Sequence, residues 1–89
     1  MSSNPLVSVI IPTYNCGAYI GEAIGGVLAQ TYDTYEIIVV DDGSTDDTGE
    51  MLKGRYGDRI RYFYKENGGC ASARNYGIKM ALGEYIAFL

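Results

Sequence analysis

The chain lacks histidine and tryptophan, and its 89 residues include only two prolines and two cysteines. The absence of histidine excludes imidazole metal sites, Ser–His and Cys–His catalysis and a histidine general base among these residues. Cys16 and Cys70 lack the C-x-x-C spacing of a metal or redox pair. We therefore interpret them as free intracellular thiols, close to one another in loops or at helix starts, rather than as a redox pair or a reactive site.

Positive charge is also scarce, because seven Lys and Arg residues stand against eleven Asp and Glu residues and the net charge is −4. An acidic chain with a pI near 4.5 argues against a nucleic-acid-binding surface. No apolar run approaches the roughly 18 to 20 residues of a membrane span, and no basic region followed by a long apolar one begins the chain. We expect one cytoplasmic domain, either free or held at the cytoplasmic face of a membrane by other parts of a longer protein.

Apolar runs rich in β-branched residues alternate along the chain with segments of helical periodicity. The runs 7–13 and 36–41 are continuously apolar, which is typical of parallel strands that are covered on both faces. The run 59–64 alternates in polarity, as an edge strand does. We expect strands at 7–13, 36–41, 59–64 and 84–88, and helices from Asn15 or Gly17 to about 30, from about 44 to 56 and from about 71 to 81. Ser44 is the expected N-cap of the second helix, with Asp47 three residues later.

The order β-α-β-α-β-α-β predicts an α/β fold with a doubly wound, Rossmann-like parallel sheet and right-handed crossovers. We expect the strand order 3-2-1-4 and three layers, with helices on both faces of the sheet. In such a sheet the loops that follow the strands gather at one edge, where ligands bind. These loops are residues 12–15, residues 41–44, residues 65–69 and whatever follows Leu89. They should therefore form one site.

The side chains in these loops suit a nucleotide. Tyr14 offers an aromatic face on which a base can stack. Asp41 and Asp42 only accept hydrogen bonds, so a carboxylate here can bind the imide N–H of uracil, thymine or guanine. The backbone N–H groups of Gly68–Gly69, with Arg74 one turn into the next helix, predict a cradle for a diphosphate. Each feature taken alone is explained by packing, turn or capping chemistry, and it is their expected meeting at one edge that favours a nucleotide site.

Six strings occur in an order that resembles the start of the family-2 glycosyltransferases of the GT-A fold. They are PTYN, AQTY, EIIVVDDGSTDDT, ENGG, ARNYGI and GEYIAFL, and the resemblance runs from about Leu6 to Leu89. It implies that residues 1–89 are the N-terminal nucleotide-sugar-binding part of a glycosyltransferase domain. The family's reaction is an inverting transfer of a sugar, usually a hexose, from a nucleotide diphosphate donor to an acceptor hydroxyl, as in cell-wall or polysaccharide synthesis. The expected donor is a UDP-sugar.

The resemblance assigns binding roles to residues of this chain by position. The candidate nucleotide-sugar-binding residues are Pro12, Thr13, Tyr14, Asn15, Asp41, Asp42, Asn67, Gly68 and Arg74. The first three should line the base pocket, Asp42 should read the imide N–H, and Asn67, Gly68 and Arg74 should lie near ribose or diphosphate. The family's Asp-x-Asp motif, which holds Mg²⁺ or Mn²⁺, would begin after Leu89. We therefore assign no metal ligand and no catalytic residue here, and we expect the isolated chain to be inactive.

Two other enzyme or switch classes fit the sequence less well. A nicotinamide-dependent dehydrogenase would have G-x-G-x-x-G after the first strand, where this chain has Pro12-Thr-Tyr-Asn15. A phosphorylation-dependent receiver domain would have its acidic pair after strand one, whereas this pair follows strand two. A non-catalytic nucleotide-binding or interaction module of the same fold stays open as the alternative.

The last strand is the expected open edge of the sheet. Residues 84–89 form an apolar run in which Glu84 is the only charged residue. An exposed edge of this kind tends to pair with another strand. We therefore expect the chain to self-associate through residues 84–89, or this segment to fray.

Overall fold

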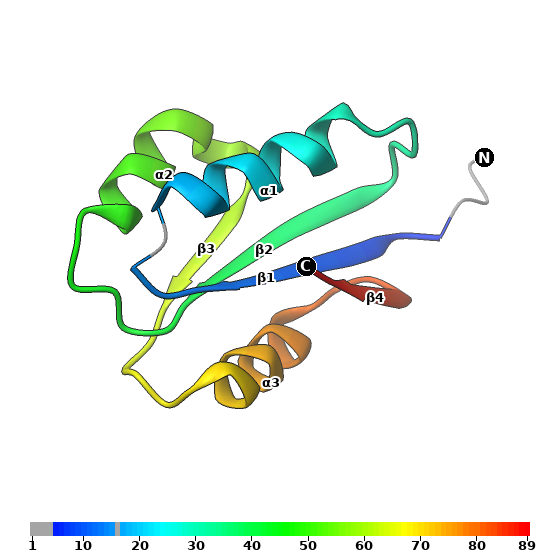
Figure 1. Cartoon of the computed structure of the whole chain (residues 1–89). Coiled ribbons are helices and arrows are strands. Elements are labelled where there is room, and N and C mark those ends of the chain that lie inside the picture. The colour runs from blue at the N-terminus through cyan, green and yellow to red at the C-terminus, as the bar shows by residue number, and fades with distance from the viewer. Residues whose placement is uncertain (1–4, 16) are drawn as a thin grey trace.

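The computed structural model describes residues 5–15 and 17–89, and strands alternate with helices along the chain (Figure 1). The elements are β1 (Val7–Thr13), α1 (Gly17–Ala29), β2 (Tyr35–Asp41), α2 (Thr48–Tyr56), the 3₁₀ turn η1 (Gly57–Arg59), β3 (Arg61–Tyr64), α3 (Cys70–Met80) and β4 (Tyr85–Phe88). The predicted succession of strands and helices is confirmed. No helix in the described part of the chain is both long enough and apolar enough to cross a membrane.

The four strands form one parallel sheet in the order β3-β2-β1-β4, as the alternation of elements predicted. In the register of the central pair, Val7 lies beside Tyr35 and Thr13 lies beside Asp41. On the other side of β1, Val9 pairs with Ala87 and Ile10 with Phe88. Because all strands run the same way, the residues that follow Thr13 and Asp41 emerge together at one edge of the sheet.

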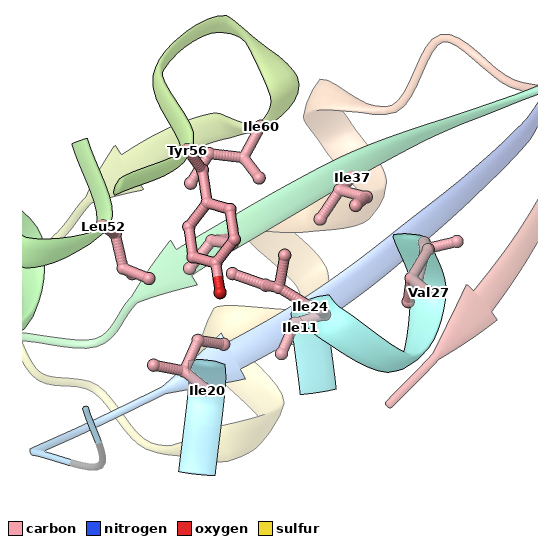
Figure 2. Close-up of a cluster of buried hydrophobic side chains, with 10 residues drawn as sticks. Ile11, Ile20, Ile24, Val27, Ile37, Leu52, Tyr56 and Ile60 are labelled. Atoms are coloured by element: carbon pink, nitrogen blue, oxygen red, sulfur yellow. The ribbon is translucent and has the colours of Figure 1, made fainter. Parts of the chain in front are cut away.

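Helices cover both faces of the sheet, so the architecture has three layers (Figure 1). Figure 2 shows the larger core, in which apolar side chains of α1 and α2 meet one face of β1 and β2. Its buried members are Val9, Ile11, Ile20, Ile24, Val27, Ile37, Val39, Leu52, Tyr56 and Ile60. On the opposite face, α3 packs through Ala73 against Ile10, Ile38 and Val40. Each of the large aliphatic side chains contributes about 1.5–3 kcal/mol when fully buried.

Two boundaries differ from the sequence-based expectations by more than one residue. Helix α2 begins at Thr48, and the predicted Ser44 cap is wrong because the Ser44 hydroxyl accepts a hydrogen bond from the Asn15 N–H instead. Strand β3 begins at Arg61 rather than at residue 59, because residues 57–59 form a 3₁₀ turn. Helix α1 begins at Gly17, which is one of its two expected starts. Of the two cysteines, Cys70 is a free, exposed thiol, and Cys16 lies outside the described residues.

Candidate functional site

A cavity of about 300 Å³ opens at the carboxyl edge of the sheet. Its lining comes from the loops after β1, β2 and β3 and from the first turn of α3, as the fold class predicted. The lining residues are Pro12, Thr13, Tyr14, Asp42, Asn67, Gly69, Cys70 and Ala73. Three loops that are distant in sequence therefore meet around one space.

The β1 side of the cavity carries an exposed ring and a buried hydroxyl. Tyr14 is 47% exposed and lines the cavity, so part of this residue is accessible to a ligand. Thr13 is only 5% exposed, and its Oγ1 atom has no hydrogen-bond partner among the residues that the structure describes. A buried hydroxyl without a partner is costly, and it can both donate and accept. Its place in the cavity wall indicates a polar ligand atom.

On the β2 side, the Asp42 carboxylate holds the loop that follows β3. Its Oδ1 atom accepts hydrogen bonds from Lys65 Nζ at 3.0 Å and from the Gly68 N–H at 2.9 Å. Its Oδ2 atom accepts from the Gly69 N–H at 2.9 Å and from Asn67 Nδ2 at 3.2 Å. Burial by itself raises the pKa of Asp42, but the Gly68 and Gly69 N–H groups and the Lys65 ammonium together hold that pKa below its usual value. The side chain is therefore a carboxylate at neutral pH.

Asn67 places a donor directly beside this acceptor. Its Nδ2 group donates to the Asp42 backbone oxygen at 2.9 Å as well as to Oδ2, and both residues line the cavity. The close approach of this loop requires glycine at position 43, where φ is +84° and a Cβ atom would lie 2.8 Å from the Asn67 nitrogen. The wall of the cavity thus offers an amide donor next to a carboxylate acceptor.

A second carboxylate lies behind the wall and holds the neighbouring loops together. Asp41 is buried, and its Oδ1 atom accepts from the Ser44 N–H at 2.8 Å while its Oδ2 atom accepts from the Tyr62 hydroxyl. The Ser44 hydroxyl accepts from the Asn15 N–H at 2.8 Å, and the Asn15 side chain accepts in turn from the Thr45 N–H at 2.8 Å. Asn15 has a φ of +48°, a left-handed conformation that asparagine tolerates. These bonds fix the loops that carry Tyr14 and Asp42.

The structure distributes the nine predicted residues over three places. Those that line the cavity are Pro12, Thr13, Tyr14, Asp42 and Asn67. Asn15, Asp41 and Gly68 make hydrogen bonds behind the wall. Arg74 lies on the exposed side of α3, with its guanidinium carbon 5.9 Å from the centre of the Phe88 ring.

The interpretation of Gly68–Gly69 as a cradle of exposed N–H groups differs from what the structure shows. Both N–H groups donate to Asp42, so they are not free for a diphosphate. Positive charge near the wall comes instead from Lys65, whose ammonium pairs with Asp42. Sequence reasoning placed Lys65 in the right loop but assigned it no role, although it is the one cation among residues 65–69.

Other residues of the site were not predicted. Cys70 and Ala73 lie three positions apart after Gly69, on the side of α3 that faces the cavity, and their helical spacing was the available signal. The link between Tyr62 and Asp41 joins two strands across the sheet, and nothing local in the sequence indicated it. Among residues 5–15 and 17–89, no three His, Cys, Asp or Glu side chains come together in an arrangement that could hold a metal ion.

Comparisons with known proteins find a matching family and similar sequences. A family model described as Glycosyl transferase family 2 matches residues 8–89. An uncharacterized glycosyltransferase of Rickettsia typhi is 62% identical over 86 residues, which make up 97% of this chain and 27% of that protein.

Solved structures share the fold. The crystal structure of S. aureus TarS 1–349 has a TM-score of 0.80 and 35% identity, over 93% of this chain and 26% of that one. The mannosyltransferase PcManGT of Pyrobaculum calidifontis, in complex with GDP-Man and Mn²⁺, has a TM-score of 0.78 and 30% identity, over 96% of this chain and 27% of that one. The sheet and its order are therefore those of the GT-A fold, and the chain spans about a quarter of the length of these three proteins.

Proposed function

The chain belongs to glycosyl transferase family 2, and from this we propose that its cavity binds the nucleotide of a nucleotide-diphosphate-sugar donor. The observation that carries the proposal is the hydroxyl of buried Thr13, which has no hydrogen-bond partner in the described part of the chain and lines the same cavity as the Asp42 carboxylate and the exposed Tyr14 ring. A flat aromatic face with polar groups at its side suits a base better than a sugar or a peptide.

We propose that Asp42 and Asn67 read the edge of the base. An imide edge presents an N–H beside a carbonyl oxygen, and the wall presents a carboxylate acceptor beside an amide donor. The bond from Asn67 Nδ2 to Asp42 Oδ2 is the longest of the four bonds to this carboxylate, at 3.2 Å. When a base enters, this amide turns from Oδ2 to the ring carbonyl, and the ring N–H takes its place at Oδ2.

This pairing selects uracil, thymine and guanine, because each has an N–H next to a carbonyl group. Cytosine presents a bare nitrogen acceptor where the imide presents its N–H, so the Asp42 Oδ2 atom would face another acceptor in place of a donor. We propose a UDP-sugar as the donor. The GDP-Man in the Pyrobaculum calidifontis structure carries a base with the same kind of edge.

The remaining parts of the reaction extend beyond the cavity. We propose an inverting transfer, in which an acceptor hydroxyl attacks the anomeric carbon as the nucleotide diphosphate leaves, with a hexose as the sugar. Tyr14 stacks on the base and Thr13 bonds to it, while Lys65 and Arg74 lie toward the ribose and diphosphate. Asn67, which the resemblance placed near the ribose or diphosphate, serves the base edge in this proposal. No three His, Cys, Asp or Glu side chains among the described residues could hold a metal ion, and we propose that the Mg²⁺ or Mn²⁺ of a full-length parent is held by other residues. We also propose a cytoplasmic location, pairing of residues 84–89 with a second copy, and no transfer by the isolated chain.

The test is a thermal-shift screen of the chain and of its longer parent against UDP-, dTDP-, GDP- and CMP-sugars, with and without Mn²⁺ or Mg²⁺. We expect an imide-containing nucleotide to raise the melting temperature and the CMP-sugar to have little effect. A sugar-transfer assay should then show turnover by the parent and none by the chain. A parent that binds these nucleotides without turnover would identify the non-catalytic module, and the absence of any nucleotide binding would contradict the proposal.

A further inference from the structure

The two oxygen atoms of the Asp42 carboxylate have different kinds of partner. Oδ1 accepts hydrogen bonds from the Lys65 ammonium at 3.0 Å and from the Gly68 N–H at 2.9 Å. Oδ2 accepts from the Gly69 N–H at 2.9 Å and from the Asn67 amide at 3.2 Å. Asn67 and Gly69 line the cavity, whereas Lys65 and Gly68 do not. Oδ2 is therefore bonded on the cavity side, and Oδ1 is held from behind the wall.

Lys65 is fixed at both ends. Its backbone N–H donates to Asp41 O at 2.9 Å, which places the residue directly after β3 and beside the end of β2. Its ammonium donates to the Glu66 backbone oxygen at 2.6 Å as well as to Asp42. The Lys65 side chain is only 16% exposed and that of Asp42 only 8%, so salt screens this ion pair less than a surface pair. Lys65 thus contacts the candidate base-reading group without lining the space that a base would occupy.

We infer that Lys65 is a positioning residue for base recognition, whose ammonium holds Oδ1 and so keeps Oδ2 directed at the ring N–H. The inference rests on the proposed base-reading role of Asp42. Rotation of an aspartate carboxylate about χ2 is only weakly restricted, so its orientation depends on its donors. Three of the four donors here are neutral amide N–H groups, and the fourth is the ammonium. Charge-assisted hydrogen bonds are about twice as strong as neutral ones, so Lys65 contributes most to this orientation.

The ammonium of Lys65 also favours the ionised form of the carboxylate. Burial raises the pKa of Asp42, and Lys65 lowers it through both its hydrogen bond and its charge. The other titratable side chains near this carboxylate are Asp41, which precedes it, and Tyr14 and Cys70 in the cavity wall. A protonated Asp42 would present an O–H donor, which suits the bare nitrogen of cytosine and not the imide N–H of uracil. Loss of Lys65 should therefore free the carboxylate to rotate and raise its pKa.

Direct contact of Lys65 with the diphosphate is a different role, and it has a different signature. UDP and CDP carry the same diphosphate, so the loss of such a contact would weaken the binding of both nucleotides equally. The loss of a positioning residue instead changes the ratio of the CDP dissociation constant to the UDP dissociation constant. This ratio therefore distinguishes orientation of the base reader from attraction of the diphosphate.

Calorimetric or NMR titration of the 89-residue chain with UDP and with CDP at pH 7 tests the inference. Lys65→Met keeps the aliphatic stem and removes the charged donor, and it should lower the CDP-to-UDP ratio at least about threefold. Lys79→Met, on the exposed side of α3, is the matched control and should leave the ratio within about twofold of the wild-type value. In the Asp42→Asn background, Lys65→Met should change the ratio less than about twofold, because the group through which it acts is gone.

A second measurement needs no nucleotide. The side-chain carboxyl resonance of Asp42, followed by NMR as a function of pH, should titrate at a higher pH in Lys65→Met than in the wild-type chain. Far-UV circular dichroism checks the fold of each variant. Lys65→Gln, which keeps a neutral donor, replaces the methionine variant if that variant unfolds, and it should change the ratio and the titration in the same directions.

The outcomes separate this inference from the proposed function. A wild-type chain that binds UDP and CDP equally would overturn the base-reading role of Asp42 and the inference with it. A wild-type preference that Lys65→Met leaves unchanged would overturn the inference alone. An equal effect of Lys65→Met in the Asp42→Asn background, or an unchanged titration of the Asp42 carboxyl group, would also overturn it.

Discussion

The Tyr62 hydroxyl donates a hydrogen bond to Oδ2 of the buried Asp41 carboxylate. This bond joins edge strand β3 to the end of β2, where the candidate base-reading residue Asp42 follows. Gly49 leaves the space for it, because a Cβ atom at position 49 would lie 2.5 Å from the hydroxyl oxygen. The candidate site thus depends on a residue that lies outside the cavity lining.

Replacement of Tyr62 by phenylalanine should lower the free energy of unfolding by about 1–3 kcal/mol, because the buried Asp41 carboxylate loses a donor. Urea denaturation measures this change. Tyr64→Phe is the matched control, since the Tyr64 ring is 59% exposed and its hydroxyl makes only a 3.4 Å bond to Ser44 O. Equal losses of unfolding free energy in the two variants would show that the bond to Asp41 stabilises the fold no more than the Tyr64 hydroxyl does.

The Tyr62 hydroxyl should also make the free energy of unfolding depend on pH in the alkaline range. Burial and the neighbouring Asp41 carboxylate raise the pKa of Tyr62 well above its usual value. A raised pKa in the folded state stabilises the fold below the unfolded-state value of about 10, and this contribution is lost as the pH rises further. The difference in unfolding free energy between wild type and Tyr62→Phe should therefore be constant up to about pH 10 and shrink above it. A difference that grows with alkaline pH would contradict this assignment.

Acid should weaken the hydrogen-bonded cluster around Glu36, which lies near the start of β2. Burial raises the pKa of Glu36, but hydrogen bonds from the Ser8 hydroxyl, the Leu82 N–H and Arg61 outweigh it and lower that pKa. Because the folded-state pKa is lowered, the stabilisation is present above the unfolded-state pKa of about 4.3 and is lost as the pH falls through the folded value.

Glu36→Gln should therefore be less stable than wild type at pH 7, and the gap should narrow toward pH 3. Glu50→Gln, at an exposed position of α2, should change stability little at either pH. A gap that is independent of pH would show that the charge of Glu36 does not stabilise the fold. Chemical denaturation at several pH values distinguishes these results.

Two glycine substitutions should show by their opposite effects on stability how closely α3 packs on the sheet. A Cβ atom at position 77 would lie 2.5 Å from Ile10 Cγ2, whereas one at position 54 would meet nothing within 4 Å. Gly77→Ala should cost about 1–3 kcal/mol of stability through overpacking. Gly54→Ala should raise the free energy of unfolding by at most about 1 kcal/mol, because alanine is the better helix former. Similar effects at the two positions would contradict the observed contact.

Strand positions could be read from the sequence where both sheet faces are buried, and less well elsewhere. The continuous apolar runs of β1 and β2 follow from burial on both faces, so their bounds were predicted within one residue. The start of α2 was missed because Ser44 bonds to Asn15, a residue from another loop. That contact depends on tertiary structure, and capping rules describe only local sequence.

The sequence predicted where the candidate site lies but not the hydrogen bonds and contacts within it. The meeting of the loops after β1, β2 and β3 follows from parallel topology alone. The four donors on Asp42 could not be foreseen, since they depend on the left-handed Gly43, which lets the 65–69 loop fold back onto the strand end. The stacking of Arg74 on Phe88 likewise joins two elements that no sequence pattern connects.

Replacement of Thr13 should weaken nucleotide binding without lowering the free energy of unfolding. Valine has nearly the same shape as threonine but lacks the hydroxyl, which has no partner among the described residues. Thr13→Val should therefore keep or slightly raise the free energy of unfolding, while UDP affinity falls about five- to tenfold through loss of one hydrogen bond. Denaturation and NMR titration measure the two quantities. A loss of stability with unchanged UDP affinity would assign Thr13 to the fold alone.

The most direct measurement compares UDP and CDP, titrated separately into the 89-residue chain and followed by calorimetry or NMR. If Asp42 accepts the imide N–H, UDP should bind about five- to one-hundredfold more tightly than CDP, because cytosine leaves the carboxylate facing an acceptor at a cost of about 1–3 kcal/mol. Asp42→Asn should reduce this preference, since an amide can both donate and accept. Equal affinities for UDP and CDP, or a preference that survives Asp42→Asn unchanged, would contradict the assignment of this cavity as a reader of the imide edge.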